Sequence, residues 1–426
     1  MEKTICELFA GVGGFRLGFE RESKEWETVW FSQWEPSRKK QWAHDCYVGH
    51  FGDIDAKTGI DISLVDKTEI PDHNLLVGGF PCQDYSVARP LPGAKGLNGK
   101  KGVLWWQIRD TLEAKKAPFA LFENVDRLLK SPASQRGRDF GVILACLASL
   151  GYSAEWRVIN AAEYGAAQRR RRTFIFAYKN DTEYGKTKDL LEPDEIITDK
   201  GFFATSFPVE KTQDLKNSDV EKNNKDVPSK TLMGIEPKVI GIGLPYEDIP
   251  SVSENFKFTF ENAGYMHKGM VYTKPVKPIL EAPIPLKEII EHGVDESYYI
   301  KEEALDKWKY LKGAKRVERT AKNGHKYNFS EGPVAFPDSL DKPARTMLTS
   351  ETSLNRSSHV ICDPETKRLR VLTPVEAERI QGFDSNWTGN CGMPEKFRYF
   401  CMGNALVVPM ITRMAKTMDE IFNKEN

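Results

Sequence analysis

The stretch Ile5–Glu20, ICELFAGVGGFRLGFE, sets the fold class. An apolar run of β type leads into a turn that contains Gly11, Gly13 and Gly14, and a helical pattern follows. Glycines let the backbone turn tightly and come close to a ligand. A strand, a glycine turn and a helix in this order are typical of a doubly wound α/β sheet, in which nucleotide-like cofactors bind at such turns.

The glycine turn lacks the features that hold a pyrophosphate or a nucleoside triphosphate. The dinucleotide fingerprint needs Gly or Ala at position 16, which is Arg16 here, and the Walker A sequence is absent. S-adenosylmethionine therefore fits this turn better than a dinucleotide does. Taken alone, the glycine spacing also fits a tight strand-helix connection that binds nothing.

Residues 1–180 repeat the alternation of β-rich runs and helical segments, which predicts a mostly parallel sheet covered on both faces. Two runs, EWRVIN (155–160) and TFIFAY (173–178), are expected to extend that sheet. Residues 181–345 are rich in Lys, Asn, Asp and Pro, and predict a smaller, irregular, mostly β domain.

Helical patterning returns in residues 346–426, which we expect to rejoin the first domain. Thr373 before Pro374 predicts a helix that starts with an N-cap and a proline at its first position. Pro409 is tolerated only in the first turn of the last helix.

The bulk composition excludes little. The 426 residues carry 61 Lys and Arg against 61 Asp and Glu, so the net charge is zero and indicates no polyanionic partner. Seven scattered cysteines without metal-ligand spacing disfavour a disulfide framework, and we expect no metal site. Because we find no targeting or membrane-spanning segment, and the thiols fit a reducing compartment, we expect a soluble cytoplasmic protein.

The stretch Leu75–Arg89, LLVGGFPCQDYSVAR, places Cys82 directly after Pro81, where an apolar run ends. Most cysteines are buried structural thiols, whereas a catalytic cysteine must be held as a thiolate at an accessible position. This stretch alone leaves both interpretations open.

Cys82 belongs to an ordered set of motifs. GGFPCQ is followed by FENV, QRRRR, RVLTPVEAERIQGF and GNALVVP, which occupy residues 78–83, 122–125, 168–172, 370–383 and 403–409. The set resembles the bacterial C5-cytosine DNA methyltransferases over about 1–180 and 340–415. The resemblance implies a catalytic and cofactor-binding domain at 1–180, a target-recognition domain at 181–345, and a return to the catalytic domain at 346–426.

The resemblance also implies S-adenosylmethionine as cofactor, with residues to hold it. Trp34 matches the aromatic residue that packs on the adenine, and Asp53 and Ile54 match the pair that holds its ring. The family's ribose-binding Glu aligns with Gln33, and Glu35 is the alternative. The other cofactor positions that the resemblance implies are Phe9, Gly11, Val12, Gly13, Gly14, Phe80, Leu104, Asn404 and Ala405.

Carbon 5 of cytosine is a poor nucleophile, and a thiolate that adds at carbon 6 activates it. The resemblance implies that Cys82 is this thiolate. Glu123 ends an apolar strand, and we expect its carboxyl to be at least partly protonated at N3 of the bound base. Arg170 would hold the ring carbonyl and support the cysteine. The residues expected to shape or brace the site are Asn124, Gln168 and Arg172.

A stacked cytosine must be flipped out of the duplex to reach such a site. The glycine-rich, basic segment 83–102 is expected to close over the DNA as a lid. The expected DNA contacts are Gln83, Ser86, Arg345, Thr346 and Arg356. We expect a monomer that acts on a short site in double-stranded DNA beside a separate restriction endonuclease, with an affinity that falls steeply with salt.

Two other functions remain open. One is an RNA (cytosine-5)-methyltransferase, which the long middle segment disfavours. The other is a catalytically silent DNA-binding regulator, which the presence of Cys82, Glu123 and Arg170 disfavours.

Overall fold

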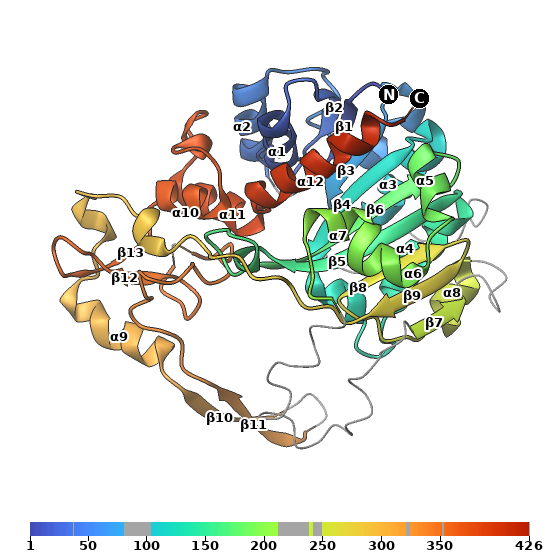
Figure 1. Cartoon of the computed structure of the whole chain (residues 1–426). Helices are drawn as coiled ribbons and strands as arrows, with labels where there is room; N and C mark the ends of the chain where they lie inside the picture. The colour runs from blue at the N-terminus through green and yellow to red at the C-terminus, as the bar shows by residue number, and fades with distance from the viewer. Residues whose placement is uncertain are drawn as a thin grey trace.

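The computed structural model describes residues 1–36, 38–80, 104–211, 238–241, 249–320, 324–351 and 353–425. Cys82, Gln83, Ser86 and nearly all of the expected lid lie outside these residues. The described residues form a larger lobe around a sheet and a smaller lobe beside it (Figure 1).

A nine-stranded sheet organises the larger lobe, in the order β2-β1-β3-β4-β6-β5-β8-β9-β7. The strands are β1 Thr4–Leu8, β2 Glu27–Ser32, β3 Leu75–Gly79, β4 Phe119–Val125, β5 Tyr152–Asn160, β6 Arg171–Lys179, β7 Lys238–Gly241, β8 Ala263–His267 and β9 Met270–Lys274. The first four strands in this order pair in parallel, and the others pair antiparallel. The runs at 155–160 and 173–178 extend the sheet as β5 and β6, which confirms that prediction.

Helices cover both faces of the sheet, as a doubly wound α/β fold requires. Ile5 faces one core with α1 (Gly14–Glu22) and α12 (Val408–Phe422), while Cys6 faces the other with α3 (Leu104–Lys115) and α4 (Arg138–Ser149). This separation follows from the alternation of side chains along a strand. The other larger-lobe helices are α2 Trp42–Phe51, α5 Glu183–Lys188, α6 Pro193–Glu195, α7 Phe202–Ser206 and α8 Ile249–Asn255.

The nine-stranded sheet extends beyond residue 181, where the sequence predicts a domain boundary. β8 pairs with β5, with Tyr265 opposite Glu155, so the sheet continues into the middle segment. α7 packs on the last helix, where Ser206 Oγ donates to Thr417 Oγ1 at 2.8 Å. The cause is the free edge of β5, whose backbone groups need partners that sequence composition does not reveal.

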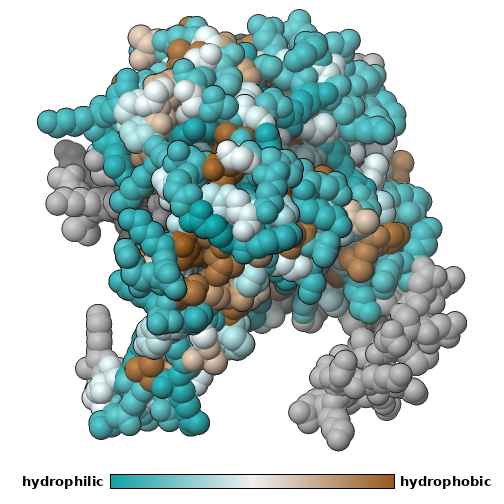
Figure 2. Space-filling view, turned by 90° about the vertical axis from the view of Figure 1, so that its left-hand side faces the viewer, coloured by the Kyte–Doolittle hydropathy of each residue, from teal (hydrophilic) through white to brown (hydrophobic). Residues whose placement is uncertain are grey.

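The smaller lobe contains short strands and one longer helix. Its elements are α9 Glu302–Lys312, β10 Lys315–Thr320, β11 Lys326–Glu331, β12 Val360–Cys362 and β13 Leu369–Val371. β10 and β11 form a projection at the lower left of Figure 2, below a surface that is largely hydrophilic with apolar patches.

The C-terminal helices start as the sequence predicts. α10 (Pro374–Gln381) has Thr373 as its N-cap, and the Glu376 side chain completes a capping box. Pro409 lies in the first turn of α12, and α11 (Glu395–Asn404) lies between these helices. Both helix-start predictions are confirmed. None of the helices in the described ranges is long and apolar enough to cross a membrane.

Candidate active site

The glycine turn follows β1 with an unusual backbone. Phe9, Gly11 and Gly13 all have positive φ, at 57°, 59° and 86°. A side chain at Gly13 would place its Cβ 2.5 Å from the ring of Phe51, whereas a Cβ at Gly11 would meet nothing within 4 Å. The turn is therefore packed behind Gly13 and open beside Gly11, which leaves room for a ligand at Gly11.

Two side chains from distant segments hold this turn. The backbone N–H of Gly11 donates to Gln33 Oε1 at 2.7 Å. Trp387 Nε1 donates to the carbonyl of Val12 at 2.9 Å, and the Trp387 ring stacks on His50 with 3.5 Å between ring centroids. Sequence reasoning missed Trp387, because nothing in its polar surroundings indicates a contact 375 positions away.

The residues predicted to hold an adenine lie on two joined segments. The Gln33 N–H donates to the carbonyl of Thr58 at 2.9 Å, and Asp53 Oδ1 accepts from the Ile54 N–H at 2.9 Å. Trp34 and Ile54 are 37% and 40% exposed. Large apolar side chains this exposed beside a buried amide offer an apolar surface to a flat ring.

Gln33 and Glu35 have different surroundings. Gln33 is buried against the glycine turn, whereas the N–H of Glu35 donates to Gln41 Oε1 at 2.7 Å, in a separate turn. Burial raises the pKa of the Glu35 carboxyl, and its Oε2 has no hydrogen-bond partner among the described residues. Of the two candidate ribose contacts, Gln33 is the one that touches the turn.

Glu123 lies at the carboxyl end of β4, next to the end of β3. Gly79 is its register partner, and a Cβ at Gly79 would lie 3.3 Å from Glu123 Oε2. Arg172 Nε lies 2.7 Å from Glu123 Oε1, and the two side chains are only 16% and 12% exposed. The carboxyl ends of neighbouring parallel strands are where α/β sheets bind ligands, so this pair stands at the expected place for chemistry.

Asn124 fixes the strand end that leads to the cysteine. Its Nδ2 donates to the carbonyl of Phe80 at 2.9 Å, and its Oδ1 accepts from the Val125 N–H at 2.8 Å. Phe80 is the last described residue before Pro81, and its ring packs in the core 5.6 Å from that of Trp105. The Asn124 side chain therefore positions the backbone that precedes Cys82, and the Phe80 ring supports the core.

Arg170 and Gln168 are buried where three segments meet. Arg170 donates to the carbonyl of Met347 at 3.1 Å and to the carbonyl of Gly403 at 2.9 Å. Gln168 Oε1 accepts from the N–H of Met347 at 3.1 Å. Burial lowers the pKa of Arg170 to about 9, and Arg172 adds to this effect.

The two arginines, two residues apart, have different partners, although they lie close enough for Arg172 to affect the pKa of Arg170. The N–H of Arg170 donates to the carbonyl of Gln168, so the chain turns there, and β6 begins only at Arg171. Arg170 consequently faces the main chain of distant segments and Arg172 faces Glu123. Arg170, which is predicted to hold the ring carbonyl, donates to two main-chain carbonyls, whereas Arg172 is the arginine that pairs with Glu123.

Three predicted DNA contacts lie among the described residues, namely Arg345, Thr346 and Arg356. Each of their side chains bonds to other groups of the protein. Arg345 pairs with Asp338, at 2.6 Å between Nε and Oδ1, and also donates to two backbone carbonyls. Thr346 Oγ1 donates to the carbonyl of Arg169 at 2.6 Å. Arg356 donates to three backbone carbonyls, those of Leu311, Gly313 and Gly332. These side chains build the smaller lobe and its junction with the larger one.

The motif at residues 403–409 returns to the glycine turn. A Cβ at Gly14 would lie 3.0 Å from Leu406 Cδ1, which places the motif against the start of α1. Asn404 is exposed at the end of α11, and the N–H of Ala405 donates to the carbonyl of Cys401 at 2.8 Å. Leu104 is half-buried as the first residue of α3.

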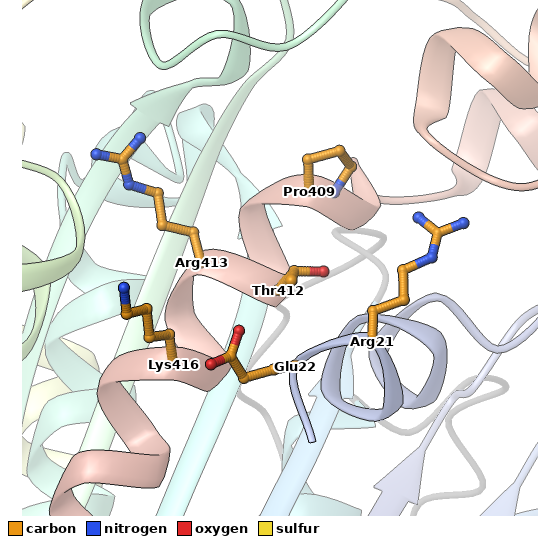
Figure 3. A pocket seen from close by; sticks show the side chains of 6 residues that line it. All are labelled: Arg21, Glu22, Pro409, Thr412, Arg413 and Lys416. Carbon is orange, nitrogen blue, oxygen red and sulfur yellow. The ribbon is translucent and has the colours of Figure 1, made fainter. Parts of the chain in front are cut away.

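A hollow at the far end of α1 lies apart from the glycine turn. No three His, Cys, Asp or Glu side chains of the described chain gather as metal ligands. An open hollow of about 370 Å³ lies between α1 and α12, on the opposite end of α1 from the glycine turn (Figure 3). Two of the cationic side chains that line this hollow form ion pairs, Arg21 with Asp384 and Arg413 with Glu281. The residues lining the hollow are Arg21, Glu22, Pro409, Thr412, Arg413 and Lys416.

The fold is that of known methyltransferases. The crystal structure of the S. pombe Dnmt2 methyltransferase matches with a TM-score of 0.56 and 14% identity, over 99% of both chains. A sequence model of the family described as C-5 cytosine-specific DNA methylase matches residues 3–420.

Curated relatives agree with the family match. The chain is 49% identical to the Type II methyltransferase M.Sau3AI of Staphylococcus aureus, over 98% of this chain and 95% of that protein. It is 31% identical to the Type II methyltransferase M.HhaI of Haemophilus parahaemolyticus, over 49% of this chain and 64% of that protein. The chain belongs to the C-5 cytosine-specific DNA methylase family, and it is a DNA (cytosine-5)-methyltransferase.

Proposed function

We propose that the enzyme transfers a methyl group from S-adenosylmethionine to carbon 5 of a flipped-out cytosine in a short duplex DNA site. The reaction proceeds through a covalent adduct between Cys82 and carbon 6. The observation that carries this proposal is the position of the Arg172–Glu123 pair, at the strand ends beside the segment that leads into Cys82.

The residues around the glycine turn suit S-adenosylmethionine. Gly11 leaves open space, the Gln33 amide lies at the turn, and Trp34 offers an exposed aromatic face. Asp53 and Ile54 would hold the adenine, and Gln33 the ribose. When bound, S-adenosylmethionine supplies an electrophilic methyl group. Its sulfonium charge also favours a thiolate nearby.

The chemistry at the base divides among three side chains. The Cys82 thiolate adds to carbon 6, and the electron pair moves onto the ring, where a proton donated by Glu123 to N3 stabilises it. Arg172 holds the ring carbonyl, because it is the arginine beside Glu123. Carbon 5 then attacks the methyl carbon, and the methyl–sulfur bond breaks to release S-adenosylhomocysteine. A base removes the proton from carbon 5, the bond between carbon 6 and the Cys82 sulfur breaks, and N3 returns its proton to Glu123.

Arg170, Gln168 and Asn124 act as positioning residues. Their hydrogen bonds to the main chain of Met347, Gly403 and Phe80 fix the segments that meet at the site.

The relatives named as Type II methyltransferases support a role in a restriction-modification system, next to an endonuclease that acts separately at the same site. We propose that the enzyme is a cytoplasmic monomer that binds double-stranded DNA, and sedimentation with and without DNA tests its oligomeric state.

The nucleophile is tested with duplex DNA that carries 5-fluorocytosine at the target position. With S-adenosylmethionine present, the methylated adduct carries fluorine at carbon 5, which cannot leave as a proton does. The wild type therefore accumulates a covalent complex that survives denaturing electrophoresis. The variant Cys82→Ser should form no complex and transfer no methyl groups. A Cys82→Ser variant with full activity refutes the assignment.

Bisulfite sequencing of DNA from expressing cells supplies the recognition sequence.

A further inference from the structure

The β10–β11 hairpin stands apart from the layers of the protein. Among the described residues its strands pair only with each other, and it projects from the smaller lobe (Figures 1 and 2). Most of its side chains are exposed. An isolated two-stranded hairpin is marginally stable in water, so a hairpin without a covering layer among the described residues calls for a partner.

The two faces of the hairpin differ in chemistry. Residues opposite each other in an antiparallel pair lie on the same face. One side, here called the polar face, has only side chains that form hydrogen bonds, namely Arg316, Glu318, Thr320, Lys326, Asn328 and Ser330. The other, here called the mixed face, carries Lys315, Val317, Arg319, Tyr327, Phe329 and Glu331.

The polar face has free groups. Glu318 pairs with Lys326 at 3.0 Å. The side chains of Arg316 and Asn328 have no hydrogen bond or ion pair with any residue that the structure describes, although both residues belong to the backbone ladder of the hairpin. On the mixed face, by contrast, the Arg319 guanidinium lies 3.8 Å from the centre of the Phe329 ring. Arg316 and Arg319 thus lie on the same strand and carry the same charge. The Arg316 side chain has no hydrogen-bond or ion-pair partner among the described residues, whereas the Arg319 side chain stacks on Phe329.

The root of the hairpin is clamped. Arg356 donates to the carbonyls of Leu311 and Gly313 before β10, and to the carbonyl of Gly332 after β11. Arg345 donates to the carbonyls of Ser357 and Ser358, close to Arg356 in the chain. These contacts fix the direction of the hairpin relative to its lobe.

The same segment reaches the active site. Two residues after Arg345, the carbonyl of Met347 accepts from Arg170, and the Met347 N–H donates to Gln168. The hairpin root and the strand that presents Arg172 to Glu123 are therefore connected by a short series of main-chain contacts.

We propose that the β10–β11 hairpin enters the major groove of the duplex next to the target cytosine, with its polar face toward the base edges. This proposal rests on the proposed function and adds the element that reads the sequence. The major groove admits a two-stranded β-ribbon, and Arg and Asn side chains bind base edges through paired hydrogen bonds. The four cations and two carboxylates of the hairpin give it a positive charge, which complements DNA.

The test compares Arg316→Ala and Asn328→Ala with Arg319→Ala, which removes the same charge as Arg316→Ala from the opposite face. Binding of the full-length protein is measured with a labelled duplex that holds the mapped site and with a scrambled duplex of equal length. Arg316→Ala and Asn328→Ala should each weaken binding to the mapped site by about tenfold or more, with little change for the scrambled duplex. Arg319→Ala should keep the ratio between the two affinities.

Three outcomes overturn the proposal. The first is an unchanged affinity ratio in both polar-face variants. The second is an equal loss for Arg316→Ala and Arg319→Ala on both duplexes, which shows phosphate contacts alone. The third is a change in sedimentation of the polar-face variants without DNA, which shows that a second copy of the chain covers the hairpin. Failure of the proposed function can be distinguished from failure of the hairpin proposal. If the proposed function is wrong, the wild type itself forms no covalent complex on 5-fluorocytosine DNA.

Discussion

Arg172 and Glu123 meet where β6 begins and β4 ends, with 2.7 Å between Nε and Oε1. The pair joins a cation to the carboxyl that is proposed to donate a proton to the base. It sits beside Gly79, where a larger residue would press on the carboxyl.

Removing either member should slow the chemical step. Arg172→Lys and Glu123→Gln should each lower the single-turnover rate of methyl transfer by about 10²-fold or more, which is the size of lost acid-base or electrostatic catalysis. Binding of S-adenosylhomocysteine, measured by calorimetry, should stay within about twofold of wild type, because neither residue lies at the glycine turn. A variant that changes only the KM for DNA contradicts this assignment.

Arg170 should matter for stability as well as for rate. In Arg170→Gln, at least one of the carbonyls of Met347 and Gly403 loses its buried donor, which costs about 1–3 kcal/mol for each unpaired group. Chemical denaturation measures this loss. Arg169→Gln is the matched control, because Arg169 is exposed and carries the same charge. Equal stability of the two variants is inconsistent with a bracing role for Arg170.

The affinity for the cofactor should show whether Gln33 or Glu35 contacts the ribose. Gln33→Ala removes the acceptor for the Gly11 N–H and should weaken S-adenosylhomocysteine binding by about tenfold, as expected for a lost hydrogen bond near a ligand. Glu35→Gln keeps its main-chain bonds to Gln41 and should bind the cofactor nearly as well as the wild type. The reverse order of affinities in calorimetry assigns the ribose to Glu35.

Glu7 should make stability depend on pH. It is fully buried in β1, and burial raises its pKa from 4.5 to about 8, although the Tyr47 hydroxyl donates to it at 3.1 Å. Between these values the unfolded chain is ionised while the folded chain keeps the proton, so the free energy of unfolding falls as the pH rises through this window.

The variant Glu7→Gln cannot ionise and should escape this loss. Its stability relative to wild type should increase between pH 5 and pH 8 by at most about 1.4 kcal/mol per pH unit. Denaturation at several pH values measures the difference. A difference that stays constant with pH shows that Glu7 is ionised throughout.

Local sequence patterns predicted the parts of the fold that depend on local physics. The glycine turn, the alternation of strands and helices, and the helix starts at Thr373 and Pro409 follow from backbone freedom, periodicity and capping. The motif set located Glu123 and the arginine segment, and the structure brings Arg172 to Glu123.

The remaining features depend on partners far along the chain. The pairing of β8 with β5 requires a free sheet edge, and the contact of Trp387 with Val12 joins residues 375 positions apart. The different partners of Arg170 and Arg172 cannot be predicted from their spacing, because the carbonyls that Arg170 binds belong to Met347 and Gly403. Arg345 and Arg356 resemble phosphate contacts in sequence, whereas the structure shows them bonded to main-chain carbonyls and, for Arg345, to Asp338.

The position of Arg170 has a consequence for protein synthesis. Its partners are Met347 and Gly403, and the latter is made 233 residues later. A nascent chain therefore carries the cysteine and glutamate motifs on the ribosome long before the arginine finds its second carbonyl. The buried contacts of Arg170 are therefore complete only after Gly403 has been synthesised, and a chain that stops before this residue leaves Arg170 without its second carbonyl.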